Sequence, residues 1–249
     1  MMSNRVLCGY DVFPLAFGTS TFVKGKLSPD ADSETGIAAL RSALKNGVNV
    51  IHSMSSLGTQ WGVRQVLDTE RSGYDTVHII KKKTDRPFTP EELGGFVDQN
   101  IASLGGGRAI VQIEFSKNDD FDLDRKIEFL KKITAPEAVA RYPILVHLAN
   151  EKDADDLIGI EGISGFTVKY NSENTWIEPY LHKIEATSAD LVVMSPFNRV
   201  APPNKACVEK IFSDILSHGC VKCIVLSSTD TTHWYDNISA AKQLGGSIE

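Results

Sequence analysis

Short apolar runs alternate with longer stretches of helical periodicity along the whole chain. The apolar runs are Leu15 to Phe22, Asn49 to Met54, Val77 to Lys82, Ala109 to Phe115, Ile144 to Asn150, Gly165 to Tyr170, Asp190 to Pro196 and Lys222 to Ser228. This order is typical of repeated strand–helix units around a parallel sheet. Because eight such units favour closure over an open sheet, the pattern predicts an α/β fold, a (β/α)8 TIM barrel that occupies residues 1–249 as a single domain.

Local signals mark the ends of several predicted elements. The segment Thr89-Pro90-Glu91-Glu92 combines an N-cap, a proline in the first turn and a capping-box glutamate, and Gly105-Gly106-Gly107 ends the helix that follows. Ser33 can cap a helix that closes at Gly47. Before the first barrel strand, Arg5 to Pro14 is predicted to form a β-hairpin that plugs one end of the barrel.

Composition and charge narrow the class of partner. The chain has 249 residues, of which 42% are hydrophobic and 23% charged, enough for one sizeable core. A formal charge of −6 argues against a nucleic-acid or anionic-membrane partner, because both need a basic face. The start of the chain has no basic segment followed by an apolar run, and no stretch approaches the roughly 20 apolar residues of a membrane span. We therefore expect a cytoplasmic protein that binds neither nucleic acid nor a membrane.

Three of the four cysteines lie near the C-terminal end of the sequence. Cys220 and Cys223 have the spacing of a redox motif, and with His218 and Cys207 they could supply four zinc ligands. The segment leads into a predicted strand, however, and does not open a helix, where a thiolate would be stabilised. A structural role is favoured, and no metal site is predicted.

Six motifs occur in a defined order along nearly the whole chain. They are Leu15-Ala16-Phe17-Gly18-Thr19; Gly47 to Ser53 followed by Leu57-Gly58; Val146-His147-Leu148-Ala149-Asn150; Gly165 to Asn171; Met194-Ser195-Pro196-Phe197; and Ser227 to Asn237. In this order and spacing they resemble LGxGT, GxNxIDT…YG, IGVSN, VVQxxYN, YSPL and the closing phosphate-binding segment of the aldo-keto reductase superfamily. The resemblance implies the same barrel, with the site at the C-terminal ends of the strands.

The resemblance also implies a catalytic tetrad. The family uses Asp, Tyr, Lys and His: the tyrosine donates a proton to a carbonyl, the lysine and aspartate lower its pKa, and a nicotinamide delivers hydride. Carried over, these positions are His52, Leu57, Lys82 and Glu114. Leucine cannot donate a proton, so the resemblance predicts that only the lysine is retained.

The cofactor pocket implied by the resemblance is altered as well. The positions that hold the nicotinamide amide and stack under its ring are Ala149, Asn150, Thr167 and Met194. The segment that holds the 2′-phosphate, Ser228 to Tyr235, contains Asp230 and no lysine or arginine, and an acidic residue there repels a phosphomonoester. The connection after Pro196 is short, which predicts shortened covering loops. No cofactor is favoured, although NAD(P)H remains possible.

Independently of the resemblance, strand alternation predicts an unusually polar barrel interior. If Lys82 points inward, so do His78 and Ile80; the same rule selects Gln112 and Glu114 on the fourth strand. On the second, fifth and sixth strands it selects His52, His147, Thr167 and Lys169. Buried polar groups without partners cost about 1–3 kcal/mol each, so these groups must pair, hold water or meet a ligand.

Several chemical roles are open for this polar cluster. Lys82 and Glu114 could be a plain ion pair; alternatively Glu114 or His52 could act as general acid or base while Lys82 stabilises an oxyanion or forms a Schiff base. His52, His147 and Glu114 could also form a two-histidine, one-carboxylate metal site, although Lys82 would repel the cation. Backbone amides after Ser227 and Ser228 could hold a phosphate or carboxylate, or merely belong to a helix cap.

Three functions follow from these residues. The favoured one is an acid/base enzyme that acts without nicotinamide on a small carbonyl-bearing or polar metabolite, as an isomerase, lyase, dehydratase or cyclase. The alternatives are a divergent NAD(P)H-dependent reductase and a non-catalytic barrel that binds a metabolite or a protein. In each case a small-molecule ligand is expected at the C-terminal face of the barrel.

Overall fold

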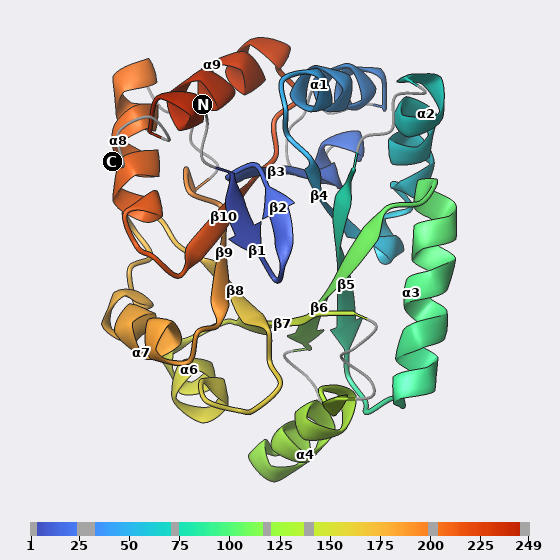
Figure 1. Ribbon diagram of the computed structural model, residues 1–249, viewed down its shortest axis with the longest axis vertical. Coiled ribbons are helices and arrows are strands. Elements are labelled where there is room, and N and C mark those ends of the chain that lie inside the picture. Colours follow the sequence, from blue (N-terminus) through green and yellow to red (C-terminus); the bar gives the residue numbers. More distant parts are fainter. Residues whose placement is uncertain are drawn as a thin grey trace.

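The computed structural model shows a closed barrel of eight parallel strands (Figure 1). It describes residues 4–23, 33–70, 75–116, 121–136, 142–198 and 204–244. The barrel strands are β3 (Leu15–Gly18), β4 (Val50–Met54), β5 (Val77–Thr84), β6 (Arg108–Phe115), β7 (Ile144–Leu148), β8 (Gly165–Lys169), β9 (Asp190–Met194) and β10 (Val221–Leu226). They follow one another around the barrel in chain order, and β10 closes it against β3. Each predicted apolar run overlaps one of these strands, although β5, β6 and β10 extend one or two residues beyond their runs, so the predicted (β/α)8 fold is confirmed.

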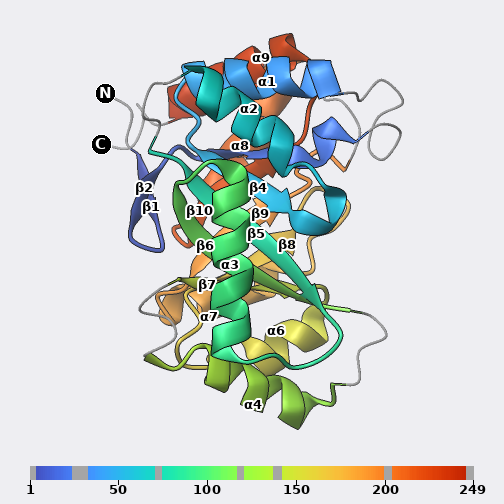
Figure 2. The ribbon, with the colours of Figure 1, turned by 90° about the vertical axis from the view of Figure 1, so that its right-hand side faces the viewer.

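Helices surround the barrel on its outside (Figures 1 and 2). The α-helices are α1 (Ser33–Lys45), α2 (Gln60–Glu70), α3 (Pro90–Leu104), α4 (Leu123–Ile133), α6 (Glu151–Leu157), α7 (Leu181–Ala186), α8 (Lys205–Leu216) and α9 (Thr231–Leu244). Short 3-10 helices are η1 (Thr19–Phe22), η2 (Ser55–Leu57) and η3 (Glu178–Tyr180). The predicted capping box is present at α3, where the Thr89 hydroxyl accepts from the Glu92 amide and the Glu92 carboxylate accepts from the Thr89 amide. Among the described residues, no helix is both long and apolar enough to cross a membrane.

The predicted hairpin forms and covers the N-terminal end of the barrel. Strands β1 (Arg5–Leu7) and β2 (Tyr10–Val12) pair antiparallel. Leu7 and Val12 are fully buried and pack into the apolar cluster inside the barrel. The Arg5 guanidinium donates to the Leu216 carbonyl oxygen at 2.7 Å and also to that of Val221, which fastens the hairpin to the barrel wall. Ligand access is therefore left to the opposite, C-terminal end.

Two apolar clusters lie on the two faces of the barrel wall, one inside the barrel and one outside it. The inner cluster includes Ala16, Val50, Val77, Ile79, Ile110, Leu145, Val192, Cys223 and Val225. The outer cluster, between strands and helices, takes the alternate strand residues, Ile80 among them. Because most inner apolar residues lie in the N-terminal halves of the strands, alternation brings the polar inward residues to the C-terminal halves.

This arrangement corrects the predicted register of β5. Val77 and Ile79 belong to the inner cluster, so Lys81 points into the barrel and Lys82 points out. The expectation that His78, Ile80 and Lys82 face inward was therefore wrong by one residue. A one-residue slip moves every side chain of a strand to the other face. On β4, β6, β7 and β8 the predicted inward positions agree with the two clusters. The predicted short connection after Pro196 lies partly outside the described residues.

Candidate functional site

The C-terminal mouth of the barrel holds a charged arc on four neighbouring strands. We define this charged arc as Lys81 and Lys83 on β5, Glu114 on β6, His147 on β7 and Lys169 on β8. The inward strand-end positions on the remaining four strands are uncharged: Met54 on β4, Met194 on β9, Val225 on β10 and Gly18 on β3. Charge is thus concentrated on one half of the mouth.

Lys81 and Glu114 form an ion pair within this arc. Both side chains are about one-fifth exposed, at 18% and 20%, so water screens the pair only in part. Burial alone raises the pKa of Glu114, but the hydrogen bond and charge of Lys81, with His147 and Lys83 nearby, outweigh burial and hold that pKa below its ordinary value. The glutamate is therefore ionised near neutral pH and keeps the Lys81 ammonium in place.

Lys82, the lysine expected in the site, lies outside the barrel. Its ammonium sits over the rings of Phe88 and Phe96, at 4.7 and 4.3 Å from the ring centroids. Burial lowers its pKa, with a smaller contribution of the same sign from Arg86. Because it packs under α3, it cannot reach a ligand in the mouth, and Lys81 takes the position that was expected for it.

His147 is held as a neutral base at the edge of the arc. Burial lowers its pKa, against the raising effect of Glu114. Its Nδ1 lies 3.1 Å from both the backbone oxygen and the hydroxyl of Thr167. Since a carbonyl oxygen can only accept, Nδ1 carries the proton, and the neutral ring presents Nε2 as an acceptor. Thr167 is fully buried and acts as the support of this ring.

His52 lies one layer deeper than the arc and is bonded to Gln112. Its Nε2 is 2.6 Å from the Gln112 side-chain oxygen. Burial lowers the pKa of His52 to about 4, so the ring is neutral near pH 7. The other end of the amide, Nε2 of the fully buried Gln112, has no hydrogen-bond partner within the described chain. The predicted acid/base role of His52 is thus less suited to the geometry than a supporting role, and the free amide donor is the feature that remains available.

The residues that resemblance assigns to a nicotinamide amide are largely engaged elsewhere. The Asn150 side chain caps α6 by accepting from the Asp153 amide at 3.1 Å. Thr167 supports His147, as described above. Met194 is partly exposed at the mouth and packs against the inner cluster, where an apolar side chain can contact a flat ring. The amide clamp of the family is therefore not reproduced.

The segment after β10 offers hydroxyl groups and an acid. The Ser227 hydroxyl lies 3.0 Å from the Ser20 hydroxyl. The Ser228 hydroxyl accepts from the Asp230 amide at 3.2 Å, and the Asp230 carboxylate accepts from the Thr232 amide at 2.7 Å in the first turn of α9. The N-terminus of α9 thus already has an anionic side chain on its amides. The serine hydroxyls can contact phosphate oxygens, but Asp230 disfavours an added 2′-phosphate.

The position of the family's tyrosine, Leu57, ends the 3-10 helix η2 after β4. It is partly buried and has no group that can donate a proton. Gly58, which follows, adopts a left-handed conformation with φ of 63° and ends this turn. Leu57 therefore cannot donate a proton, and the charged donors at inward positions of the mouth are Lys81, Lys83 and Lys169.

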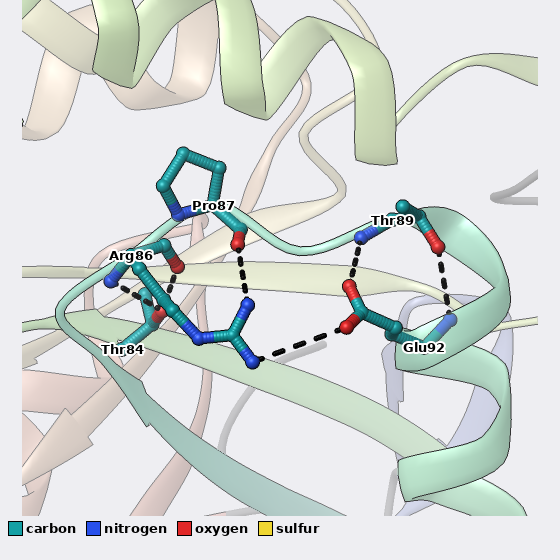
Figure 3. Close-up of polar contacts among 5 residues, drawn as sticks. All are labelled: Thr84, Arg86, Pro87, Thr89 and Glu92. Carbon is teal, nitrogen blue, oxygen red and sulfur yellow. Dashed lines mark hydrogen bonds and ion pairs between the residues drawn. The ribbon is translucent and has the colours of Figure 1, made fainter.

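A hollow lies outside the barrel, between α4 and the turn that follows β5; Figure 3 shows the polar contacts of this turn. This pocket has a volume of about 610 Å³, and its apolar part is formed by Phe88, Phe121 and Phe129. Arg86 in the turn contacts Glu92 at 3.9 Å and donates to the Pro87 carbonyl at 3.3 Å. These contacts fix the turn between β5 and α3, and hence the strand end that carries Lys81 and Lys83.

The cysteine cluster considered as a zinc or redox site has other properties. Burial raises the pKa of Cys220 to about 11 and that of Cys223 to about 12. Cys223 lies in the inner apolar cluster and is fully buried. Across the described ranges, no group of three or more His, Cys, Asp and Glu side chains is arranged to hold a metal ion. These thiols are therefore packing residues in the described structure.

Comparison with known proteins identifies the fold. No family model and no curated protein sequence matches the chain. Solved structures do match: PA4992 of Pseudomonas aeruginosa, a candidate aldo-keto reductase, has a TM-score of 0.72 at 16% identity and covers 98% of this chain and 94% of its own. The aldo-keto reductase AKR11C1 of Bacillus halodurans, in its holo form, has a TM-score of 0.71 at 14% identity, with coverages of 97% and 91%. The Bombyx mori aldo-keto reductase AKR2E4, solved with NADP, has a TM-score of 0.71 at 14% identity, with coverages of 96% and 91%. The chain has the aldo-keto reductase fold.

Proposed function

We propose that this protein is a divergent carbonyl reductase in which Lys81 binds the substrate's carbonyl oxygen and gives it a proton. The observation that carries the proposal is the Lys81–Glu114 ion pair at the C-terminal mouth. An ammonium fixed in a partly dehydrated site stabilises the negative charge that develops on a carbonyl oxygen when a nucleophile or hydride adds to its carbon. This reading reverses the preference for nicotinamide-free chemistry that the sequence suggested.

Each residue of the pair has a definite task in this proposal. The hydride that reduces the carbonyl carbon would come from a bound nicotinamide. Lys81 donates a hydrogen bond to the carbonyl oxygen, passes it a proton as the alcohol forms, and is reprotonated from solvent. Glu114 holds the ammonium in place through the ion pair. Leu57 leaves an apolar wall where the tyrosine of the family would stand.

The solved structures of the same fold support a nicotinamide cofactor more strongly than the residues of this chain do. Aldo-keto reductases of the same fold are solved with NADP, from Bombyx mori and from Klebsiella pneumoniae. In this chain, Met194 and the hydroxyls of Ser20 and Ser227 suit a flat ring and phosphate oxygens. Asn150 and Asp230 are engaged with helix amides and do not reproduce the family's contacts. The fit is partial, and it favours NADH over NADPH because Asp230 would repel the extra phosphate.

The test begins with the cofactor. Titration of the purified protein with NADH and NADPH, followed by nicotinamide fluorescence and by calorimetry, measures both dissociation constants. Oxidation of the bound cofactor is then measured with a panel of aldehydes and ketones, for the wild type, Lys81→Met and the matched control Lys82→Met. We expect NADH to bind more tightly than NADPH, and only Lys81→Met to abolish turnover. Binding of neither cofactor would refute the proposal.

One observation supports a second candidate, an acid/base enzyme that needs no nicotinamide. The neutral His147 ring presents an unshared Nε2 beside Lys81 and Glu114, which is the arrangement of a general base next to an oxyanion-binding lysine. In that case His147 would remove a proton from the carbon next to a carbonyl while Lys81 holds the enolate oxygen. Solvent deuterium exchange into small ketones and aldehydes, abolished by His147→Ala and by Lys81→Met without any cofactor, would establish this function. Ligand binding without exchange or reduction would indicate a binding protein.

A further inference from the structure

The charged arc has more lysines than it has acids to neutralise them. Lys83 projects from the end of β5 beside Glu114, and Lys169 projects from the end of β8. Both side chains are exposed, and within the described part of the chain neither has an ion-pair partner. Glu114 is already engaged by Lys81, and His147 is neutral. Three lysines and one glutamate leave an excess of two positive charges on one half of the mouth.

This positive excess stands out against the rest of the molecule. The whole chain carries a formal charge of −6, so the mouth is a positive site on an acidic protein. Unpaired lysines held on one half of the mouth repel one another, and an anion bound between them offsets that repulsion. The lysines influence their neighbours across the mouth: the charge of Lys83 lowers the pKa of Glu114, and the charges of Lys81 and Lys169 lower the pKa of His147. Lys83 is in register with Glu114, and Lys169 lies on the strand that pairs with the strand of His147, so the groups line one continuous arc of the mouth.

A second, independent feature points to a ligand with oxygen acceptors. The amide nitrogen of Gln112 is fully buried beneath the arc and has no hydrogen-bond partner among the described residues. A buried amide donor without a partner costs about 1–3 kcal/mol, which an acceptor oxygen that reaches it would recover. The arc thus combines fixed positive charges at its edge with an unused donor at its base.

We propose that the substrate of this site is a small anion, a carbonyl compound that also carries a carboxylate or a phosphate group, bound between Lys83 and Lys169. The proposal deepens the proposed function, because it places the anionic group on the outer lysines and leaves Lys81 for the carbonyl oxygen. The uncharged half of the mouth, near Met54 and Met194, remains for the cofactor. A neutral aldehyde or ketone of the same size would lack this contact and bind more weakly.

Calorimetric titration with two simple probes, inorganic phosphate and malonate, tests the anion site directly. We expect both probes to bind the wild-type protein, with an affinity that falls as sodium chloride is added. Lys83→Gln and Lys169→Gln should each weaken binding about fivefold, and the double variant about twentyfold or more, as expected for partly exposed charge contacts. Lys210→Gln is the matched control, because Lys210 is an exposed lysine on the outer helix α8 without an ion pair in the described structure. A preference for phosphate or for malonate distinguishes the two kinds of anionic group.

Two outcomes would overturn the inference: absence of anion binding to the wild type, or equal weakening by Lys210→Gln and by the two arc variants. The titration is repeated with saturating NADH, since the cofactor is itself an anion. Lys83→Gln and Lys169→Gln must weaken the probes and leave the dissociation constant of NADH unchanged. If NADH fails to bind while the probes bind through Lys83 and Lys169, the reductase proposal fails and the anion site stands. If NADH binds and supports reduction but neither Lys83→Gln nor Lys169→Gln weakens probe binding, the reductase proposal stands and the anion site fails.

Discussion

Replacement of each of two adjacent lysines by methionine tests which of them points into the barrel. Lys81 is paired with Glu114 in the mouth, with one-fifth of each side chain exposed, whereas Lys82 packs on two phenylalanine rings beneath α3. In Lys81→Met the glutamate loses its counter-charge in a partly dehydrated site. Breaking a fully buried pair costs roughly 3–5 kcal/mol, and residual exposure should reduce this to about 1–2 kcal/mol. In Lys82→Met, two cation–π contacts worth about 0.5–1 kcal/mol each are exchanged for methionine–aromatic packing, so the net change should be below about 1 kcal/mol.

The decisive assay needs no known substrate. The titration of the Glu114 carboxyl is followed by carbon-13 NMR, with Glu114→Gln used to assign its signal. The pKa of Glu114, which Lys81 holds below its ordinary value, should rise in Lys81→Met and stay in place in Lys82→Met. In a turnover assay, loss of one oxyanion-binding donor should lower kcat by about a hundredfold or more in Lys81→Met only. If the pKa of Glu114 changed in Lys82→Met and stayed the same in Lys81→Met, the strand register would be refuted and, with it, the site.

Three further predictions concern stability and are checked by urea unfolding. Gly107→Ala should destabilise the fold by about 2–4 kcal/mol, because a Cβ there would lie 2.7 Å from the His78 ring at a φ of +107°. The control Gly106→Ala has a similar φ and open space around it, and it should cost only about 1–2 kcal/mol. Equal costs for the two variants would contradict the close approach of Gly107 to His78. Burial lowers the pKa of both His52 and His78 to about 4 in the fold, against 6.5 in the unfolded chain, so the unfolded state takes up more protons between these two values. The free energy of unfolding should therefore fall as the pH drops from about 6.5 to 4, by up to about 3 kcal/mol per histidine. His78→Leu should remove the contribution of His78 to this pH dependence, and an unchanged pH dependence would show that the ring is not buried. Thr89→Ala should cost about 1 kcal/mol through loss of the α3 capping box, and a neutral effect would show that the box is frayed in solution.

The sequence predicted the barrel because its signals are repeated and mutually consistent. Each strand is an apolar run bounded by helix signals, and the capping box at Thr89 and the hairpin before Leu15 are local patterns that need no tertiary information. Alternation also placed Glu114, His147 and Thr167 correctly, because the residues next to them in the strand are apolar and belong to the outer face.

The same rule failed on β5 because that strand carries no alternation. Its first half, Val77 to Ile80, suits either face, and its second half is a run of three lysines. The choice of Lys82 therefore depended on an alignment, and an alignment at low identity tolerates a shift of one residue. The signal that could have identified Lys81 is tertiary: Val77 and Ile79 are opposite inward residues of neighbouring strands, and only the closed barrel shows this. The unused donor of Gln112 was likewise beyond prediction, since it depends on the orientation of an amide that His52 fixes from another strand.

The corrected register changes the chemical meaning of the substitutions in the mouth. The resemblance places an aspartate on β4 beside the family's lysine, and this chain has His52 there, buried and neutral. With Lys81 as the inward lysine, the carboxylate comes instead from Glu114 on β6, so a lysine–carboxylate pair is present although neither the aspartate nor the tyrosine is. With the carboxylate on β6 in place of β4, the paired lysine that can stabilise an oxyanion is still present. The pair then lies toward β6 and β7, next to the unshared Nε2 of His147. Loss of function alone does not account for this pair. In a site that binds an anionic substrate, Glu114 neutralises the charge of Lys81. The anionic group of the substrate is then directed to Lys83 and Lys169, and Lys81 remains free for the carbonyl oxygen.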